Sequence, residues 1–289
     1  MKNLLFIGAS GLIGTSFLEQ NKKKYNITYT HNKNKFKKSI KFDVRKNKIS
    51  DLIKKIKPVN TIIYAPTISN HTNVFNQKKV SNLINVKSNL NQLKQLKRLN
   101  CKVIFLSTQL VYNGKKGFYK ENDPKNPTLL YAKQKLEIEN YIKKNINNYL
   151  ILRLGKVIGI KKDKKDPINY FIKKITEDNI YKLATDQYSN FLYINDLINI
   201  LVIGIEQNIS GIFNVGGSLR ASRYDFYTQI LKQNNITKFN HKIKKCKIND
   251  LNFTEKQPKD TSLNINKLKK EFKYKPKSYV AFLKEININ

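Results

Sequence analysis

Tyr131 and Lys135 are the residues whose types and spacing most directly suggest chemistry. They lie four residues apart in the segment Tyr131–Lys144, whose pattern predicts a helix, so both side chains share one face. A lysine ammonium roughly 6 Å from a phenol is expected to lower the phenol's pKa from its ordinary value of about 10. The pair would then act as a proton donor and acceptor near neutral pH.

Thr108 adds a hydroxyl at the end of an apolar strand. The run Val103–Ser107 predicts a buried strand, and Thr108 follows it, 23 residues before Tyr131. In a parallel sheet, the hydroxyl from this strand end and the phenol from the next helix can converge on one carbonyl oxygen. Thr108 would donate a hydrogen bond to that oxygen, and Tyr131 would deliver a proton as a hydride reaches the carbon. Lys135 would reach the ribose of a nicotinamide cofactor.

A glycine-rich turn near the amino terminus suggests what the chain binds. The apolar strand Leu4–Ile7 runs into glycines spaced three apart, and a helix pattern follows. Such a turn leaves backbone N–H groups at a helix N-terminus, where the helix dipole favours a pyrophosphate. Gly8 is expected to take the turn, Gly11 to let the ligand approach, and Gly14 to let the helix lie on the strand. The predicted dinucleotide contacts in this loop are Gly8, Ser10, Gly11, Leu12, Ile13 and Gly14.

The net charge of +36 does not by itself indicate nucleic-acid binding. Only five of the 56 basic residues are arginines, and arginine is the residue that usually reads phosphates and base edges. The lysines run from Lys2 to Lys284 and accompany heavy use of Asn, Ile, Tyr and Phe, all of which have A/T-rich codons. We therefore expect a solvated lysine-rich surface and no nucleic-acid partner.

Other compositional features point to a cytoplasmic globular protein. Cys101 and Cys246 are too few and too far apart for a disulfide framework or a zinc site, and no metal is expected. No apolar run approaches the roughly 20 residues that a membrane span needs, and there is no secretory signal. The apolar residues nevertheless occur in coherent runs, which favours a folded core.

The first half of the chain alternates between strand and helix patterns. This alternation predicts parallel βαβ units and an α/β fold of the Rossmann type, with a doubly wound parallel sheet whose ligands bind beyond the carboxyl ends of the strands. The predicted strands are Leu4–Ile7, Ile27–Thr30, Ile40–Phe42, Thr61–Ala65, Val103–Ser107 and Tyr149–Leu152. The predicted helices are Ile13–Glu19, Ile49–Ile56, Val80–Leu99 and Tyr131–Lys144.

After about Gly155 the pattern changes. We expect a dinucleotide-binding domain over residues 1–155 and a smaller α/β substrate-binding cap over residues 156–289, with some elements of the second part returning to the first domain. The charged run Lys161–Pro167 is typical of a loop. The other elements predicted here are helix Asn169–Ile175, the apolar run Phe191–Ile194, helix Asp196–Glu206, and strand Ile212–Val215 ending at Gly216 and Gly217.

An ordered series of motifs resembles the extended short-chain dehydrogenases/reductases, and within them the dTDP-4-dehydrorhamnose reductases. The stretches that carry the resemblance are residues 8–14, 107–114, 121–127, 131–135, 211–218, 224–226, 257–263 and 267–268. The resemblance implies reduction of the 4-keto group of a nucleotide-linked 6-deoxy sugar, in the synthesis of rhamnose for surface polysaccharides. It also implies a catalytic set of Thr108, Tyr131 and Lys135 with Asn85 as a supporting helix asparagine, and cofactor contacts from Asp43 and Val44 at the adenine, from Ala65, and from Tyr131 and Lys135.

Three positions depart from that family pattern. Gln109 stands where an aspartate is usual, and Lys156 where a tryptophan is expected against the sugar. The usual Asn-Ala-Ala at the end of the fourth strand is Tyr64-Ala65-Pro66 here. These departures leave open the exact sugar and any metal dependence, but the reduction itself requires none of the three.

Neighbouring activities fit less well. A sugar-nucleotide 4,6-dehydratase needs an acid and a base after the catalytic threonine, and Gln109-Leu110 supplies neither. A bifunctional epimerase–reductase needs a cysteine or histidine near the sugar. Cys101 precedes the catalytic strand, and His71 and His241 have no motif context, so plain 4-keto reduction is the better prediction.

The end of the second predicted strand bears on the choice of cofactor. An acidic residue there would accept from the ribose 2′-OH and select NAD, but the stretch Thr28–Lys33 contains none. His31 and Lys33 lie in this stretch instead, and Lys33 and Lys35 could attract a 2′-phosphate. The sequence therefore favours NADPH, with NADH as the alternative.

Two functions of other classes stay open at this stage. One is a non-catalytic subunit that binds a dinucleotide and partners another enzyme. The other is nucleic-acid binding. Within the same family, the alternative is another sugar-nucleotide reductase or an epimerase. The intact set of Thr108, Tyr131 and Lys135 favours an enzyme that binds a nucleotide sugar, as a monomer or a homodimer, without membrane association.

Overall fold

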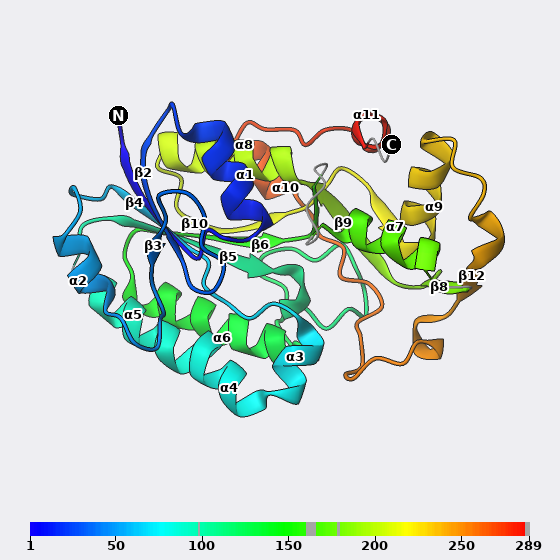
Figure 1. Cartoon of the computed structure of the whole chain (residues 1–289), viewed down its shortest axis with the longest axis horizontal. Coiled ribbons are helices and arrows are strands. Elements are labelled where there is room, and N and C mark those ends of the chain that lie inside the picture. Colours follow the sequence, from blue (N-terminus) through cyan, green and yellow to red (C-terminus); the bar gives the residue numbers. More distant parts are fainter. Residues whose placement is uncertain (98, 160–165, 178–179, 287–289) are drawn as a thin grey trace.

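The computed structural model describes residues 1–97, 99–159, 166–177 and 180–286. The chain forms a large part built on a central sheet and a smaller part beside it (Figure 1). The smaller part carries helices α7 (Pro167–Glu177) and α9 (Arg223–Gln233).

Seven parallel strands form the central sheet. In spatial order they are β10 (Gly211–Val215), β6 (Tyr149–Leu154), β5 (Lys102–Thr108), β4 (Thr61–Tyr64), β1 (Asn3–Ile7), β2 (Asn26–His31) and β3 (Ile40–Lys41). The order runs outward in both directions from the β1–β4 pair, which confirms the predicted doubly wound fold. In such sheets ligands bind where the order reverses, beyond the carboxyl ends of the strands.

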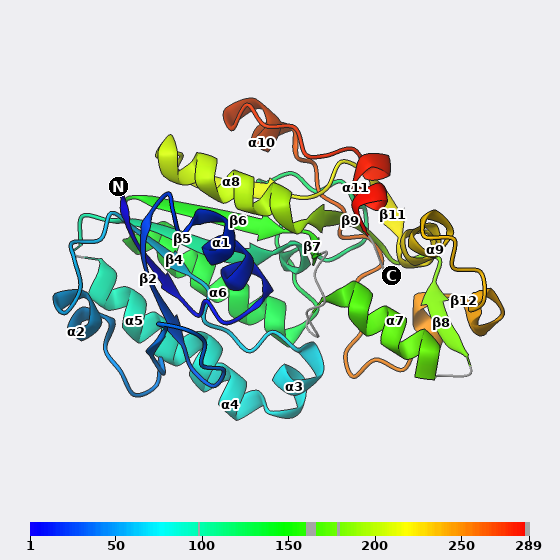
Figure 2. The same ribbon diagram turned by 45° about the horizontal axis from the view of Figure 1, so that its top comes forward.

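Alternating residues of each strand build two separate cores. In β1, Leu4 and Phe6 belong to one core, and Leu5 and Ile7 to the other, as the two-residue period of a strand requires. Helices α1 (Leu12–Asn21) and α8 (Ile194–Glu206) cover the first face, whereas α2 (Ile49–Lys54), α5 (Asn89–Leu96) and α6 (Leu130–Asn145) cover the second. Figure 2 shows α8 above the sheet and α5 and α6 below it. Both faces are thus buried, which explains why the central strands read as nearly continuous apolar runs.

The smaller part has sheets of its own. Strand β9 (Tyr188–Tyr193) pairs with β7 (Lys156–Ile158) on one side and with β11 (Arg220–Ser222) on the other, and β8 (Tyr181–Ala184) pairs with β12 (Ile243–Cys246). Helix α9 covers β9, since the Phe191 and Phe226 rings stack with centroids 3.6 Å apart. The remaining α-helices of the described residues are α3 (His71–Asn76), α4 (Lys78–Asn82), α10 (Asn266–Glu271) and α11 (Tyr279–Glu285).

The predicted helix Val80–Leu99 is right in type but wrong in detail. The helical run consists of α4, a π-helical turn over Leu83–Ser88, and α5, which ends at Leu96. A π-turn inserts an extra residue into the helix and occurs mainly at functional sites. Asn85 lies within this turn, so the irregularity coincides with a predicted site residue.

Several predicted boundaries also change. Strand β6 extends to Leu154, and the apolar run Phe191–Ile194 is divided between strand β9 and the first residue of α8. Of the predicted loop Lys161–Pro167, residues 161–165 lie outside the described part of the chain, and Pro167 opens helix α7 rather than closing a loop. In the described part, each helix falls short of the length and apolar character needed to cross a bilayer.

A buried ion pair joins helix α6 to the sheet. The Arg153 guanidinium on β6 donates to both carboxylate oxygens of Glu139 on α6, the closest contact being 2.7 Å, and both side chains are 2% exposed. Ser107 near the end of β5 donates to the same carboxylate. Arg153 also donates to the Tyr112 hydroxyl, which in turn donates to the Asn214 side chain on β10. The network therefore fixes α6 relative to three strands of the sheet.

We predict that Glu139→Gln destabilises the fold strongly. The variant leaves the buried Arg153 guanidinium without its counter-charge, and breaking a buried pair in this way costs about 3–5 kcal/mol. Urea unfolding at neutral pH measures the loss. Glu137→Gln on the exposed face of the same helix is the matched control and should change the free energy of unfolding by less than about 0.5 kcal/mol. Equal effects of the two substitutions would contradict a structural role for the pair.

Candidate active site

The glycine turn lies at the point where the strand order reverses. Gly8 follows β1 with φ +80°, a conformation that L side chains rarely adopt, and an added Cβ would lie 3.0 Å from the backbone nitrogen of Pro66 after β4. Its N–H donates to the Thr30 hydroxyl at 3.0 Å, which ties the turn to the end of β2. The turn thus brings together the carboxyl ends of β1, β2 and β4.

Gly11 and Gly14 differ in the space around them. A Cβ at Gly14 would lie 2.3 Å from the carbonyl oxygen of Ala9, so helix α1 can approach β1 this closely only with glycine there. A Cβ at Gly11 would meet nothing within 4 Å. Gly11 is also the N-cap of α1, so the amides of the first turn receive no hydrogen bond from an N-cap side chain. This arrangement suits a diphosphate.

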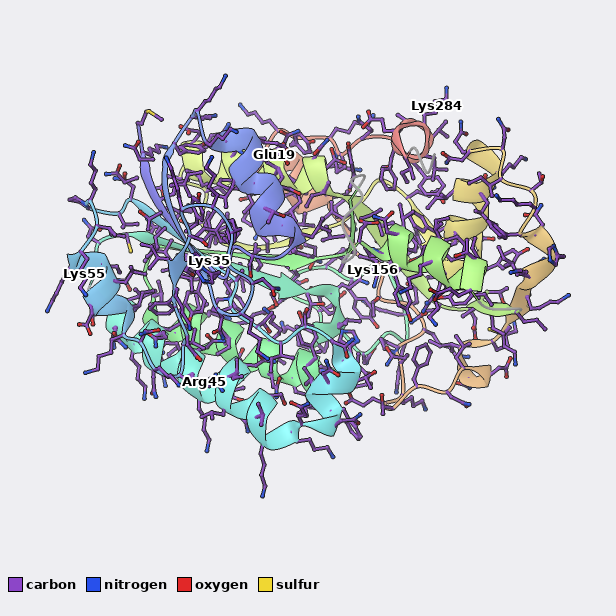
Figure 3. The ribbon with its side chains drawn as sticks, in the orientation of Figure 1. Glu19, Lys35, Arg45, Lys55, Lys156 and Lys284 are labelled. Carbon is purple, nitrogen blue, oxygen red and sulfur yellow. The ribbon has the colours of Figure 1, made fainter. Side chains whose placement is uncertain are left out.

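The end of β2 carries no acidic side chain. His31 is buried, and its Nδ1 lies 2.8 Å from the Ser39 hydroxyl, whereas Lys33 and Lys35 are exposed. Figure 3 labels Lys35 in the loop that follows β2. The two lysines are thus free to meet an anion, while His31 has a structural partner.

Asp43 and Val44 follow β3, and both are buried. The Asp43 carboxylate accepts from the Arg45 guanidinium at 2.6 Å, and the hydrogen bond from Arg45 lowers the pKa of this carboxyl. Asp43 is therefore ionised and anchored at this edge of the sheet. Its predicted contact with an adenine stays a prediction.

Thr108, Tyr131 and Lys135 come from neighbouring elements. Thr108 is the last residue of β5, and Tyr131 and Lys135 lie in the first turns of α6. The Lys135 ammonium donates to the Leu106 carbonyl oxygen at 2.9 Å and lies 5.9 Å from the centroid of the Tyr131 ring. The Thr108 hydroxyl accepts from the Leu110 N–H at 3.3 Å and keeps its own proton available for donation.

The predicted lowering of the Tyr131 pKa is wrong for the protein without ligands. Burial raises the pKa of the phenol above its ordinary value, because the phenolate would lose its hydration. Burial also lowers the pKa of Lys135 to about 8, only partly offset by Glu139. The sequence argument counted the charge of the lysine and could not count the desolvation of both groups. A protonated phenol is still the form that donates a proton to a substrate.

Asn85 connects its own helical turn to the loop after β4 and to helix α6. Its side-chain oxygen accepts from the Ile68 N–H at 2.7 Å, and its amide donates to the Gln134 side chain on α6 at 2.8 Å. Asn89, one helical turn later, donates to the Pro66 carbonyl oxygen and accepts from the Tyr64 hydroxyl. These contacts hold the loop after β4 against α6, so Asn85 acts here as a positioning residue.

His71 is a site residue that the sequence argument missed. It is the first residue of α3 and lies against Tyr131, with the two ring centroids 5.0 Å apart. Burial and then the charge of Lys156 lower the pKa of His71 to about 4, so the imidazole is neutral at pH 7. The histidine was set aside for lack of a local motif, since only the tertiary fold brings the end of β4 to α6.

Gln109, which follows strand β5, connects the large part to the smaller part. Its side-chain amide exchanges two hydrogen bonds with the Ser189 hydroxyl on β9, at 2.8 and 3.0 Å. Within the described residues, no cluster of three or more His, Cys, Asp or Glu side chains could hold a metal ion. Gln109 therefore has a structural partner in the smaller part.

Hollows elsewhere on the surface lie far from these residues. One is lined by Leu96, Asn100, Cys101 and Ile146, and another by Asn3, Asn26 and Lys57. Both open at the amino-terminal edge of the central sheet. Ligands of doubly wound sheets bind at the opposite edge, where the groups described above converge.

Comparisons with known proteins agree with this geometry. A family model described as "RmlD substrate binding domain" matches residues 1–287. The beta subunit of methionine adenosyltransferase 2 from Xenopus tropicalis is 23% identical over 235 residues, which are 78% of this chain and 70% of that protein. A dTDP-4-dehydrorhamnose reductase from Aggregatibacter actinomycetemcomitans is 26% identical over 203 residues, 65% of this chain and 67% of that protein.

A solved structure shows the same fold. The crystal structure of a dTDP-4-dehydrorhamnose reductase from Bacillus anthracis in complex with NADP superposes with a TM-score of 0.87. The alignment covers 99% of both chains at 20% sequence identity. At this identity the likeness concerns the fold, and the chemistry has to be argued from the residues.

We predict that Lys135 makes stability depend on pH in a specific window. Because its pKa is lowered to about 8 in the folded protein and is about 10.4 when unfolded, the unfolded chain binds more protons between these values. The free energy of unfolding should therefore rise with pH, by about 1.5 kcal/mol between roughly pH 8 and 9.5, relative to Lys135→Met. Urea unfolding of both proteins across this range measures the difference. Parallel pH profiles would show that the ammonium is not desolvated in the fold.

Proposed function

The chain belongs to the RmlD substrate binding domain family, and from this premise we propose that it is an NADPH-dependent reductase of nucleotide-linked 4-keto-6-deoxy sugars. dTDP-4-dehydrorhamnose is the leading candidate substrate, and dTDP-rhamnose for surface polysaccharides the corresponding product. The observation that supports the proposal is that Lys135 lies 5.9 Å from the Tyr131 ring centroid and donates to the Leu106 carbonyl oxygen, two residues before Thr108 at the carboxyl end of β5.

The residues around the glycine turn fit a dinucleotide. The uncapped first turn of α1 and the open space at Gly11 would accept its diphosphate. Lys33 and Lys35 are exposed where the ribose of the adenosine half would lie. The end of β2 carries no acidic side chain, so nothing there would repel a 2′-phosphate on that ribose. These features support NADPH over NADH. When bound, this cofactor supplies the hydride.

The chain's own groups would handle the substrate oxygen. The Thr108 hydroxyl would donate a hydrogen bond to the sugar carbonyl oxygen, and the Tyr131 phenol would transfer its proton there as negative charge develops. Lys135 would stabilise the tyrosinate that remains, because its ammonium lies beside the Tyr131 ring. Asn85 would keep α6 and the loop after β4 in register during this transfer.

We assign the substrate side of the site to the region 156–289. Strand β9 meets the catalytic strand through Gln109 and Ser189, and β7 begins directly after the end of β6. A sugar nucleotide held by these elements would present its carbonyl to Tyr131 and Thr108.

The proposal predicts NADPH oxidation on addition of a keto sugar nucleotide. The purified protein is mixed with NADPH and dTDP-4-dehydrorhamnose, and the near-ultraviolet absorbance of NADPH is followed. Tyr131→Phe should lower kcat by at least about 100-fold, because it removes the general acid, and should leave the Kd for NADPH within about twofold. Absence of turnover with every dTDP-, UDP- and GDP-linked keto sugar would reject the reductase.

A second candidate is a dinucleotide-binding subunit that assists another enzyme. The likeness to a protein named as a methionine adenosyltransferase subunit favours it. The ordered catalytic set argues against it, since a subunit without chemistry has no need of a hydrogen-bonded lysine beside a tyrosine. Co-purification with an unrelated enzyme, together with NADPH binding but no turnover, would establish this alternative.

A pair of glycine variants tests the cofactor site separately from catalysis. Gly11→Ala should leave the free energy of unfolding within about 0.5 kcal/mol, because its Cβ meets open space, but should weaken NADPH binding by at least about tenfold. Gly14→Ala should instead destabilise the fold by roughly 1–3 kcal/mol, because its Cβ would overlap Ala9. Calorimetric titration and urea unfolding measure the two effects. NADPH binding by Gly11→Ala at wild-type strength would place the cofactor elsewhere.

A further inference from the structure

Lys156 lies beside the end of the catalytic strand. Thr108, the last residue of β5, is in register with Leu154 on β6, and Lys156 follows two residues later as the first residue of β7. The Lys156 charge also reaches His71, whose ring lies against Tyr131. Figure 3 shows Lys156 between the large part and helix α7. Its ammonium is therefore at the border between the catalytic groups and the smaller part.

The ammonium of Lys156 has no fixed partner. Across the described ranges of the chain, it makes no hydrogen bond or ion pair within 4.0 Å. Asp166 is the acidic residue nearby, but its carboxylate already accepts from the backbone N–H groups of Gly159 and Ile168. The Lys156 side chain is exposed. Desolvation by the neighbouring protein, and then the charge of Arg223, nevertheless lower the pKa of its ammonium to about 8.

Arg223 brings a second cation to the same face of the smaller sheet. Lys156 is in register with Phe191 on β9, and α9, which begins at Arg223, covers the Phe191 side of that strand. One guanidinium nitrogen of Arg223 donates to the Tyr181 hydroxyl at 3.3 Å, but the buried Nε–H has no acceptor. A buried donor without an acceptor is costly, and the Arg223 charge disfavours the Lys156 ammonium, because like charges repel each other. Both costs fall if an anion binds between them.

We propose that Lys156 and Arg223 form an anion subsite on the substrate side of the active site, which binds a carboxylate or phosphate group of the sugar nucleotide. The inference rests on the proposed function for the identity of the ligand as a sugar nucleotide. Two groups share the required chemistry. One is the diphosphate that links the sugar to its nucleoside, and the other is a carboxylate at C6 of the sugar, in place of the methyl group of a 6-deoxy sugar. Arg223 can offer its Nε–H and a terminal N–H to one anionic group, and Lys156 can add a charge-assisted hydrogen bond.

The subsite is tested by binding rather than by turnover. NADP-loaded protein is titrated calorimetrically with UDP-glucose and with UDP-glucuronate, which carry the same diphosphate and differ in one carboxylate. Lys156→Met and Arg223→Met are each compared with the wild type, and Lys284→Met on exposed α11 controls for the loss of one positive charge. Retained NADP binding shows that each variant is folded.

Each variant is expected to weaken binding by at least about tenfold, the usual effect of losing one charge-assisted hydrogen bond, with less than about twofold loss in Lys284→Met. Lys156→Arg should recover most of the affinity. Weakening of UDP-glucuronate alone assigns the subsite to a sugar carboxylate, and equal weakening of both ligands assigns it to the diphosphate.

Unchanged affinity for both ligands in both variants, or no binding of either ligand to the wild type, overturns the subsite. This result is separate from the reductase test. Failure of the subsite leaves NADPH oxidation with a keto sugar intact, whereas failure of the reductase appears as absent turnover with ligand binding preserved.

Discussion

The buried pair of Glu139 and Arg153 is the constraint on which the site geometry depends. A charged pair at 2% exposure is tolerable only with its remaining hydrogen bonds satisfied, and Ser107, Tyr112 and Asn214 contribute to satisfying them. The partners come from β5, α6, β6, β10 and the loop after β5. A shift of α6 along the sheet would leave several buried groups unpaired, so the helix that carries Tyr131 has essentially one allowed position on the strand that carries Thr108.

Local sequence patterns were enough to predict much of the fold and which side chains lie at the strand ends. The strand before Gly8, the strand before Thr108 and the helix from Tyr131 are each specified by neighbouring residues, through apolar runs and glycine spacing. Parallel topology then follows from their alternation, and it places every strand end on one edge. The sequence was therefore sufficient to predict which side chains lie at that edge. Their roles as site residues stay predictions.

What the sequence could not supply depends on burial and on contacts between distant segments. His71 contacts Tyr131 in the folded chain, and Asn85, in a π-turn that no local pattern predicts, ties the loop after β4 to α6. The raised pKa of the phenol likewise arises from surrounding protein, not from the lysine one turn away. The unpaired donor on Arg223 is visible only once α9 is packed on its sheet. In each case the sequence does not reveal which groups the folded chain brings together and removes from water.

The position of β10 has a consequence for how such chains can be recombined. This strand comes from the second half of the sequence, yet it completes the edge of the central sheet beside β6, and Asn214 on it accepts a hydrogen bond from Tyr112. The two halves are thus interlaced rather than joined in tandem. A chimaera that took its whole second half from a relative, through one crossover at the end of β6, would import a foreign strand into the central sheet. To exchange substrate preference, a chimaera would need at least two junctions between the parent sequences, placed so that β10 still comes from the same parent as the rest of the central sheet.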